Sequence, residues 1–197
     1  MANKIVKKFV KGVVYAFYKI AFRFKIQGLE NIPRFEPCIL APNHISNFDA
    51  PLIYVMTKRD MNVMGKASIF KVPVLGSFLR YMGVYPVERN NKDMGAVKKS
   101  LTYLKQGNVL CIFPEGTRNG FAKGEPLHNG VAFLALAGKV PVIPVGINGK
   151  YKLFSKITVK IGKPIAFEQY YGTKNAKEKF PEINETILKE IQALLDK

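Results

Sequence analysis

His44 is one of two histidines in this chain of 197 residues, and Asp49 follows it five positions later in the segment APNHISNFDAP. In a straight strand or within one helix, that spacing places two side chains on different faces, so the pair can meet only across a bend. Asn43 and Asn47 favour a turn, and Ser46 with Asp49 has the S-x-x-D spacing of a helix start. We therefore expect His44 at a strand end and Asp49 in the first turn of a helix.

Two interpretations of the His44 and Asp49 pair follow from this spacing. The carboxylate of Asp49 could accept the Nδ1 hydrogen of His44, fix the ring tautomer and leave Nε2 free as a general base. Alternatively, His44 is an ordinary turn residue and Asp49 only caps the helix. Spacing alone does not decide between these interpretations.

A second group of polar residues, Glu115 to Arg118, follows the apolar run NVLCIF in the segment IFPEGTRNG. In open α/β sheets, ligands bind at the carboxyl ends of strands, where this turn would lie. Arg118 offers a guanidinium suited to bidentate phosphate binding, and backbone amides around Gly116 could form an anion-binding nest. The alternative is an exposed loop in which Glu115 and Arg118 form a surface pair.

Two further cations, Lys66 and Arg89, also come directly after expected strands. Together with Arg118 they would gather three positive charges near one edge of the sheet, which favours an anionic ligand. Taken singly, each of these cations is better interpreted as a solvated surface charge.

The elements that must position these residues alternate between β-rich and helical runs, as a βαβα chain does. We expect strands near residues 37–41, 62–65, 83–88, 108–113, 142–147 and 157–161. Helical spacing predicts helices near residues 47–57, 69–82, 94–104 and 130–138, and a last one carrying the apolar face of residues 183–195. This alternation predicts one α/β domain whose sheet has helices on both faces.

The first 26 residues hold seven basic side chains and no acidic one, at the spacing of an amphipathic helix. Its apolar stripe occupies an arc of about 100° and consists of Val6, Phe9, Val10, Val13, Phe17, Ile20 and Phe24. Such a stripe packs either on its own domain or into a membrane interface. Exclusively positive charge and large phenylalanines favour the membrane. We therefore predict that residues 1–26 form a membrane-association helix, with the globular domain in residues 27–197.

The formal charge of +17 favours an anionic partner, either a lipid surface or nucleic acid. Since the densest basic run lies on a helix with an apolar stripe, we expect lipid and no nucleic acid; a basic nucleic-acid-binding module is the non-enzymatic alternative. Cys38 and Cys111 lie in apolar runs, which predicts buried free thiols and a reducing compartment. No apolar run is long enough to span a bilayer, and the N-terminus lacks the pattern of a secretory signal.

Four motifs occur together in this chain: N-H-x-S-x-x-D at 43–49, GVYPVER ending at Arg89, FPEGTR at 113–118 and VPVIPVG at 140–146. With these motifs, in this order, the chain resembles the glycerophospholipid acyltransferases, most closely the short bacterial 1-acylglycerol-3-phosphate acyltransferases. The similarity covers most of the chain. The segment GKASIFKVPVLG at 65–76 also looks like the family's segment in which a lysine follows the second strand.

This resemblance implies a mixed β-sheet flanked by helices and transfer of an acyl chain to the sn-2 hydroxyl of 1-acylglycerol 3-phosphate, forming phosphatidic acid. The acyl thioester, carried by CoA or acyl carrier protein, is a co-substrate, and neither a metal nor another cofactor is expected. The resemblance makes His44 the catalytic base and Asp49 its partner. It assigns binding of the acceptor to Arg89, Glu115, Gly116 and Arg118. We add Lys66 and Thr117 as further substrate-binding residues.

A thioester is already activated, so this reaction needs an aligned hydroxyl and a base and needs no serine nucleophile. The chain contains neither the G-x-S-x-G elbow of α/β-hydrolases nor a Walker P-loop, and no Cys or His cluster suggests a metal. Acylation of glycerol 3-phosphate or of another lysophospholipid is the alternative within the family. We expect a peripheral or monotopic protein at the cytoplasmic face of the cell membrane.

Two positions depart from the family pattern. The chain has PLHNG where many relatives are lysine-rich, and Glu88 precedes Arg89 where aspartate is frequent. Neither departure affects His44 or Asp49. They leave open whether His128 or Asn129 contacts the substrate.

Overall fold

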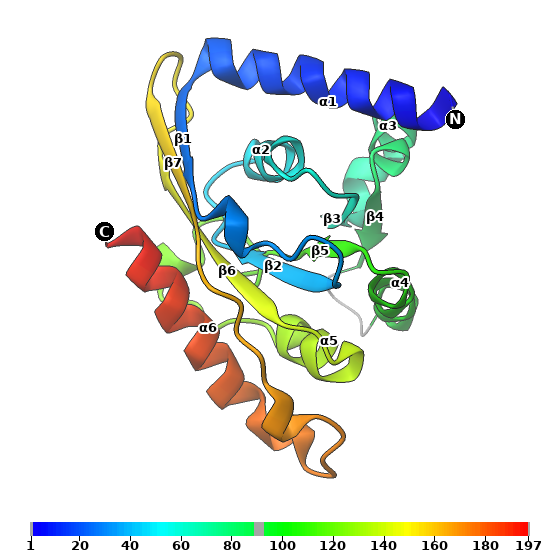
Figure 1. Cartoon of the computed structure of the whole chain (residues 1–197), viewed down its shortest axis with the longest axis vertical. Helices are drawn as coiled ribbons and strands as arrows, with labels where there is room; N and C mark the ends of the chain where they lie inside the picture. Colours follow the sequence, from blue (N-terminus) through cyan, green and yellow to red (C-terminus); the bar gives the residue numbers. More distant parts are fainter. Residues whose placement is uncertain (1, 89–92, 197) are drawn as a thin grey trace.

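The computed structural model describes residues 2–88 and 93–196, and these residues form one seven-stranded sheet with helices on both faces (Figure 1). The strand order is β1-β7-β6-β2-β5-β3-β4. Neighbouring strands run parallel except β6 and β7, which pair antiparallel. The strands are β1 (Arg23–Gln27), β2 (Cys38–Pro42), β3 (Met61–Lys66), β4 (Val84–Val87), β5 (Val109–Cys111), β6 (Val142–Gly149) and β7 (Lys156–Ile161). The prediction of a mixed α/β sheet flanked by helices is confirmed.

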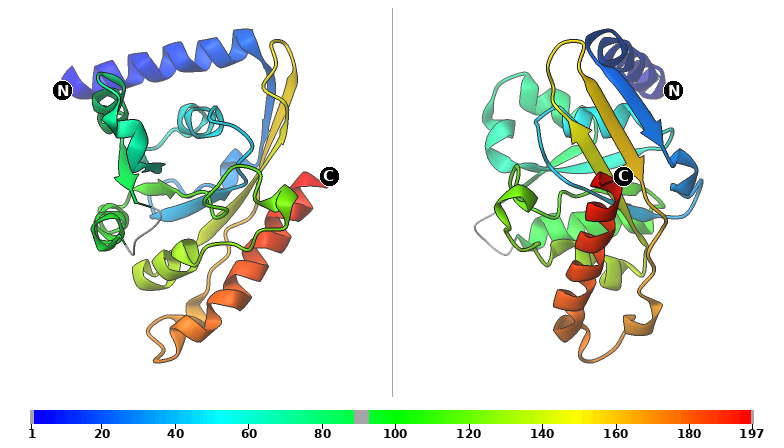
Figure 2. Two further views of the ribbon diagram at one scale, coloured as in Figure 1. Left: turned by 180° about the vertical axis from the view of Figure 1, so that it is seen from behind. Right: turned by 90° about the vertical axis from the view of Figure 1, so that its left-hand side faces the viewer.

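The helices divide between the two faces of the sheet. In Figures 1 and 2, α1 and α2 cover one face, and α4, α5 and α6 cover the other. Their bounds are α1 (Ala2–Ala21), α2 (Asp49–Met56), α3 (Leu75–Tyr81), α4 (Met94–Lys105), α5 (Gly130–Gly138) and α6 (Phe180–Leu195).

The central strand β2 shows why its sequence is a continuous apolar run. Cys38 and Leu40 belong to the core beneath α1 and α2, whereas Ile39 and Ala41 belong to the core against α5 and α6. Successive residues of a strand point to opposite faces, so a strand covered on both faces needs apolar residues at every position. All five residues of β2 are accordingly buried.

Cys38 and Cys111 lie on the neighbouring strands β2 and β5, and both are buried free thiols, as predicted. Burial raises the pKa of the Cys38 thiol to about 12 and also raises the pKa of Cys111. Both side chains therefore act as small apolar residues of the core.

The predicted bounds of two helices are wrong. The expected helix at 69–82 is a short 3-10 helix at Ala67–Lys71 followed by α3, because Pro73 disfavours a helical residue before it and Val74 has a φ of 65°. The predicted N-terminal helix is too long, since it ends at Ala21 and the next residues form β1 beside β7. Phe24 therefore lies in the sheet. The division of the chain at residue 26 stays a prediction.

The outer face of α1 carries most of the predicted apolar stripe. Of its residues, Phe9 and Ile20 are 71% and 74% exposed, and Val6, Val13 and Phe17 are exposed as well. Ile5, which the prediction did not include, is 70% exposed beside them. Packing of this stripe on its own domain, the alternative interpretation, is therefore wrong for these residues. No helix within the described residues is long and apolar enough to cross a membrane.

A different face of α1 holds the helix on the domain, and its apolar contacts come from Val14, Tyr18 and Ala21. The hydroxyl of Tyr18 donates a 2.6 Å hydrogen bond to the carbonyl of Phe48, directly before α2. The ammonium of Lys11 donates a 2.5 Å hydrogen bond to the carbonyl of Thr57, directly after α2. One helix is thus fixed to both ends of the other.

Candidate active site

The carboxyl end of β2 leads into the His44 segment through a buried amide. Asn43 Nδ2 donates to the carbonyl of Ile147 on β6 at 2.9 Å, and Ile147 N donates to Asn43 Oδ1 at 2.6 Å. Because β6 continues past the end of β2, this double hydrogen bond fixes the backbone where the strand ends. His44 is therefore placed by the sheet rather than by a free loop.

His44 and Asp49 meet across the bend between β2 and α2. Nδ1 of His44 lies 2.8 Å from Oδ2 of Asp49, and the same oxygen accepts the backbone N–H groups of Ile45 and Ser46 at 2.8 and 2.7 Å. The side chain of Asp49 is fully buried and that of His44 is 13% exposed. A carboxylate held in this way orients Nδ1 as a donor and leaves Nε2 free.

Asp49 does not cap α2 in the usual way, since Phe48 holds the N-cap position and makes no side-chain cap. The carboxylate instead gathers the ring and the two amides that precede its own helix. This geometry is the one required by the first interpretation of the pair.

The loop after β5 fixes the His44 backbone from the other side. Oε1 of Glu115 accepts the backbone N–H of His44 at 2.6 Å, and Asn119 N donates to the carbonyl of His44 at 2.7 Å. The second oxygen, Oε2, accepts the N–H of Phe121 at 2.9 Å. Burial raises the pKa of Glu115, and these backbone donors oppose that shift. The loop after β5 thus holds the backbone of His44 in place. The imidazole ring of His44 packs on Phe113 at a centroid distance of 4.1 Å.

A cavity of about 940 Å³ opens beside His44. Its polar side is lined by His44, Asn47, Lys66, Thr117, Arg118, Asn119 and Lys123. Its other walls come from apolar residues of α2, β3, α3 and their surroundings, among them Val55, Met64, Ile69, Leu75, Phe78 and Met82. The cavity therefore offers cations near the histidine and apolar surface beyond it.

The residues predicted for ligand binding separate into two groups. Lys66, Thr117 and Arg118 line the cavity, as expected from their positions at strand ends. Glu115 is 2% exposed and, within the described part of the chain, neither it nor Gly116 lines the cavity. The alternative interpretation, a surface pair of Glu115 and Arg118, is absent from the ion pairs of the described residues. Arg89 lies outside the described residues.

The structure adds Lys123 and Tyr151 to the residues around the site. Lys123 lines the cavity from the 3-10 helix Phe121–Lys123, and no motif in the sequence singles it out. Tyr151 packs against Phe48 and Phe22 at centroid distances of 5.6 and 5.4 Å. Burial raises the pKa of Tyr151, and the negative charge of Asp49 raises it further.

The fold and the site together define a class of protein. It is an α/β protein in which a partly exposed histidine, oriented by a buried carboxylate, lies beside a large cavity lined by cations and apolar groups. Residues 23–148 match the family described as Acyltransferase. The chain belongs to this acyltransferase family, which confirms the resemblance inferred from the four motifs.

Individual relatives agree with this assignment. The chain is 27% identical to the 1-acyl-sn-glycerol-3-phosphate acyltransferase of Bacillus subtilis over 196 residues, which cover 96% of this chain and 97% of the relative. It is 31% identical over 185 residues to the chloroplastic 1-acyl-sn-glycerol-3-phosphate acyltransferase BAT2 of Brassica napus. That match covers 86% of this chain, which spans about half the length of the plant relative.

A solved structure has the same fold. The crystal structure of the 1-acyl-sn-glycerophosphate acyltransferase PlsC from Thermotoga maritima superposes with a TM-score of 0.72 at 24% sequence identity. The match covers 98% of this chain and 81% of the other.

Proposed function

We propose that this chain transfers an acyl group from an acyl thioester to the sn-2 hydroxyl of 1-acylglycerol 3-phosphate, which produces phosphatidic acid. The observation that carries the proposal is the 2.8 Å contact between His44 Nδ1 and the buried carboxylate of Asp49. The choice of acceptor is supported by the relatives, which are named 1-acyl-sn-glycerol-3-phosphate acyltransferases.

His44 acts as the general base in this mechanism. Its Nε2 takes the proton of the acceptor hydroxyl as the oxygen attacks the thioester carbonyl. The tetrahedral intermediate then expels the thiolate, which takes the proton back from the imidazolium and leaves as a free thiol. General-base catalysis contributes about 10² to 10⁴-fold, or roughly 3 to 5 kcal/mol. The reaction uses no metal or further cofactor, and the carrier of the thioester is CoA or acyl carrier protein.

The cavity supports a phosphate-bearing acceptor with a long apolar tail. Lys66, Arg118 and Lys123 line its polar side next to His44. A guanidinium binds phosphate in a bidentate manner, and the ammonium groups add positive charge. The apolar walls then accommodate an acyl chain away from water.

Helix α1 docks the protein on an anionic membrane at the cytoplasmic face, as a peripheral or monotopic protein. The exposed stripe of Ile5, Phe9, Val13, Phe17 and Ile20 supports this role, because the helix already has another face for packing on the domain. An interfacial helix buries such a stripe at the boundary between headgroups and acyl chains.

The activity is tested with purified protein, palmitoyl-CoA and palmitoyl-acyl carrier protein as donors, and three acceptors. We expect acylation of 1-acylglycerol 3-phosphate and much slower acylation of glycerol 3-phosphate and lysophosphatidylcholine. Lysophosphatidylcholine keeps a phosphate, but as a diester capped by a cationic choline, so its headgroup has no net charge. Equal rates with this acceptor would contradict the proposal that Lys66, Arg118 and Lys123 bind an anionic headgroup. Transfer that persists unchanged in a folded His44→Ala variant would exclude His44 as the base.

Docking by α1 is tested by co-sedimentation with neutral and anionic vesicles. The double variant Phe9→Ser and Phe17→Ser should weaken binding to both kinds of vesicle, because the apolar contact does not depend on lipid charge. Met94→Ser is a matched control, since Met94 is 62% exposed on α4, at the other face of the sheet. Unchanged binding of the double variant would place the membrane contact elsewhere.

A further inference from the structure

The loop of residues 150–155, which joins β6 to β7, lies beside the end of α1 in all views of Figures 1 and 2. Phe154 N donates a 2.7 Å hydrogen bond to the carbonyl of Ala21, the last residue of α1. Arg23 N donates a 2.9 Å hydrogen bond to the carbonyl of Ser155. The loop is therefore attached by its backbone to the last residue of α1 and to the first residue of β1.

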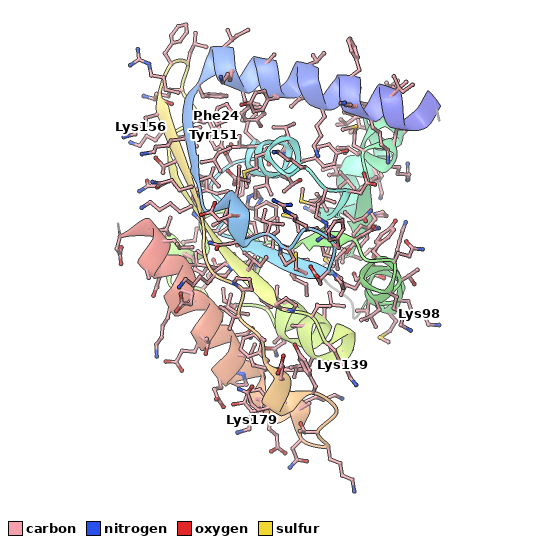
Figure 3. The ribbon with its side chains drawn as sticks, in the orientation of Figure 1. Phe24, Lys98, Lys139, Tyr151, Lys156 and Lys179 are labelled. Atoms are coloured by element: carbon pink, nitrogen blue, oxygen red, sulfur yellow. The ribbon has the colours of Figure 1, made fainter. Side chains whose placement is uncertain are left out.

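Internal hydrogen bonds give this loop a defined shape. Ser155 N and Oγ both donate to the carbonyl of Lys152, at 3.0 and 2.7 Å, and Lys152 N donates to the carbonyl of Lys150 at 2.8 Å. Tyr151, labelled in Figure 3, packs against Phe22 and is partly buried, with its hydroxyl oxygen enclosed. The base of the loop is thus anchored in the core.

The two residues at the tip are apolar and point outward. Leu153 is 68% exposed and Phe154 is 61% exposed. Phe154 also has a φ of 60°, in the left-handed region that asparagine and glycine adopt more easily than an aromatic residue. This tip therefore presents two large apolar side chains to the surroundings, at a position where a polar turn residue would suit both the backbone and water.

Positive charge surrounds the tip. Lys150, Lys152 and Lys156 are exposed on the loop and at the start of β7, and Lys19 and Arg23 are exposed at the adjoining helix end. Lys156 lies on the outer side of β7 in Figure 3. The chain contains no Asp or Glu between residues 126 and 167. Apolar tips ringed by lysines complement the interface of an anionic bilayer.

The tip also extends the exposed stripe of α1. Ile20, which is 74% exposed, precedes Ala21, and Ala21 accepts the hydrogen bond from Phe154. We infer that Leu153 and Phe154 insert into an anionic bilayer next to α1 and form a second membrane contact, an inference that rests on the proposed docking of α1. If α1 were the sole contact, the whole protein could still roll about the axis of this helix on the membrane surface. A contact on a different element, fixed to the helix end, prevents that rotation.

Because the chain contains no tryptophan, single introduced tryptophans report on each surface separately. Leu153→Trp reports on the loop, Phe17→Trp on α1 and Met94→Trp on the other face of the sheet. The probe is a vesicle of equal parts phosphatidylglycerol and phosphatidylcholine, with and without brominated acyl chains. We expect a blue shift and bromine quenching for the loop and helix reporters and no change for Met94→Trp.

Each pattern of response decides a different point. Quenching of Phe17→Trp without quenching of Leu153→Trp overturns the loop contact and leaves α1 docking intact. Quenching of Leu153→Trp alone retains the loop contact and overturns docking by α1. If neither reporter responds, both contacts are overturned.

A loss-of-contact variant gives a second measurement. Phe154→Asn keeps a residue that adopts the left-handed conformation, and Leu153→Ser removes the other apolar tip. We expect the double variant to bind these vesicles about tenfold more weakly, with unchanged circular dichroism and thermal midpoint. Affinity equal to that of the unaltered protein would overturn the inference, because folding is checked on the same sample.

Discussion

The His44 site and the outer surface of α1 depart from the usual burial of side chains in opposite directions. At the site, the carboxylates of Asp49 and Glu115 are buried, and each receives hydrogen bonds from backbone amides. On α1, large apolar side chains such as Phe9 are exposed, although the same helix packs through another face. A buried carboxylate that accepts several backbone amides indicates a site for chemistry, whereas an unpartnered apolar surface indicates contact with another phase.

Substitutions in the two regions should also affect different measured properties. Changes at the buried carboxylates should alter turnover or folding without altering vesicle binding. Changes on α1 should alter vesicle binding while turnover of a monomeric, short-chain acceptor persists. The following variants separate these outcomes.

Loss of the buried partner of His44 should have the largest effect. Asp49→Asn removes the charge that orients the ring, so kcat should fall by about 10² to 10⁴-fold, with little change in vesicle binding. Steady-state rates with short-chain acceptor measure the first quantity, and co-sedimentation measures the second. A folded Asp49→Asn protein with normal kcat would leave the 2.8 Å contact without a catalytic role.

Removal of a cavity cation should have the next largest effect. Arg118→Ala loses a charge-assisted phosphate contact, which costs roughly 1.5 to 3 kcal/mol, equivalent to about 10 to 150-fold in kcat/KM for the phosphate-bearing acceptor. Lys98→Ala is the control, because Lys98 is exposed on α4 away from the cavity. A change confined to the KM of the thioester would assign Arg118 to the donor instead. The same assay tests the prediction for Arg89.

Glu115→Gln should lower the free energy of unfolding by about 1 to 3 kcal/mol, since an amide has one oxygen for two backbone donors, the N–H groups of His44 and Phe121. Burial raises the pKa of Glu115, so as pH falls the folded state binds this proton before the unfolded state does. Stability from this proton is present at low pH and is lost as pH rises through the folded pKa. Urea unfolding across acidic to neutral pH should therefore show the variant's deficit narrowing as pH rises, and a constant deficit would contradict the assignment.

The smallest effect is expected from single lysines on α1. Lys8→Glu should weaken binding to anionic vesicles by about 1 to 2 kcal/mol, less so at high salt, and should leave binding to neutral vesicles unchanged. Lys11 is unsuitable for this test, because its ammonium is hydrogen-bonded to Thr57. Equal losses on neutral and anionic vesicles would show that Lys8 acts through folding rather than through charge.

The sequence predicts those parts of the site that are formed by residues close together in the chain. The five-residue spacing of His44 and Asp49, with turn residues between them, correctly predicts that the two meet across a bend. The contact of Glu115 with the backbone of His44 joins residues 71 positions apart, so its existence depends on how two loops close over the sheet. No local pattern carries that information.

The fold was predictable where apolar runs are long and buried. Strand β1 was missed because RFKIQ alternates charged and apolar residues directly after an amphipathic helix, so its residues continue the helical pattern. Its strand character comes from pairing with β7, more than a hundred residues later. Helical periodicity alone also did not decide whether the apolar stripe of α1 faces the domain or the surroundings, since such a pattern identifies an apolar face without identifying what covers it.

The attachment of α1 to both ends of α2 has a mechanical consequence. Tyr18 binds the carbonyl before α2 and Lys11 binds the carbonyl after it, so the longer helix α1 restrains both ends of the shorter helix α2. Asp49 is the first residue of α2. A displacement of α1 is therefore coupled to the position of the Asp49 carboxylate through α2, in addition to its direct connection to the sheet through β1.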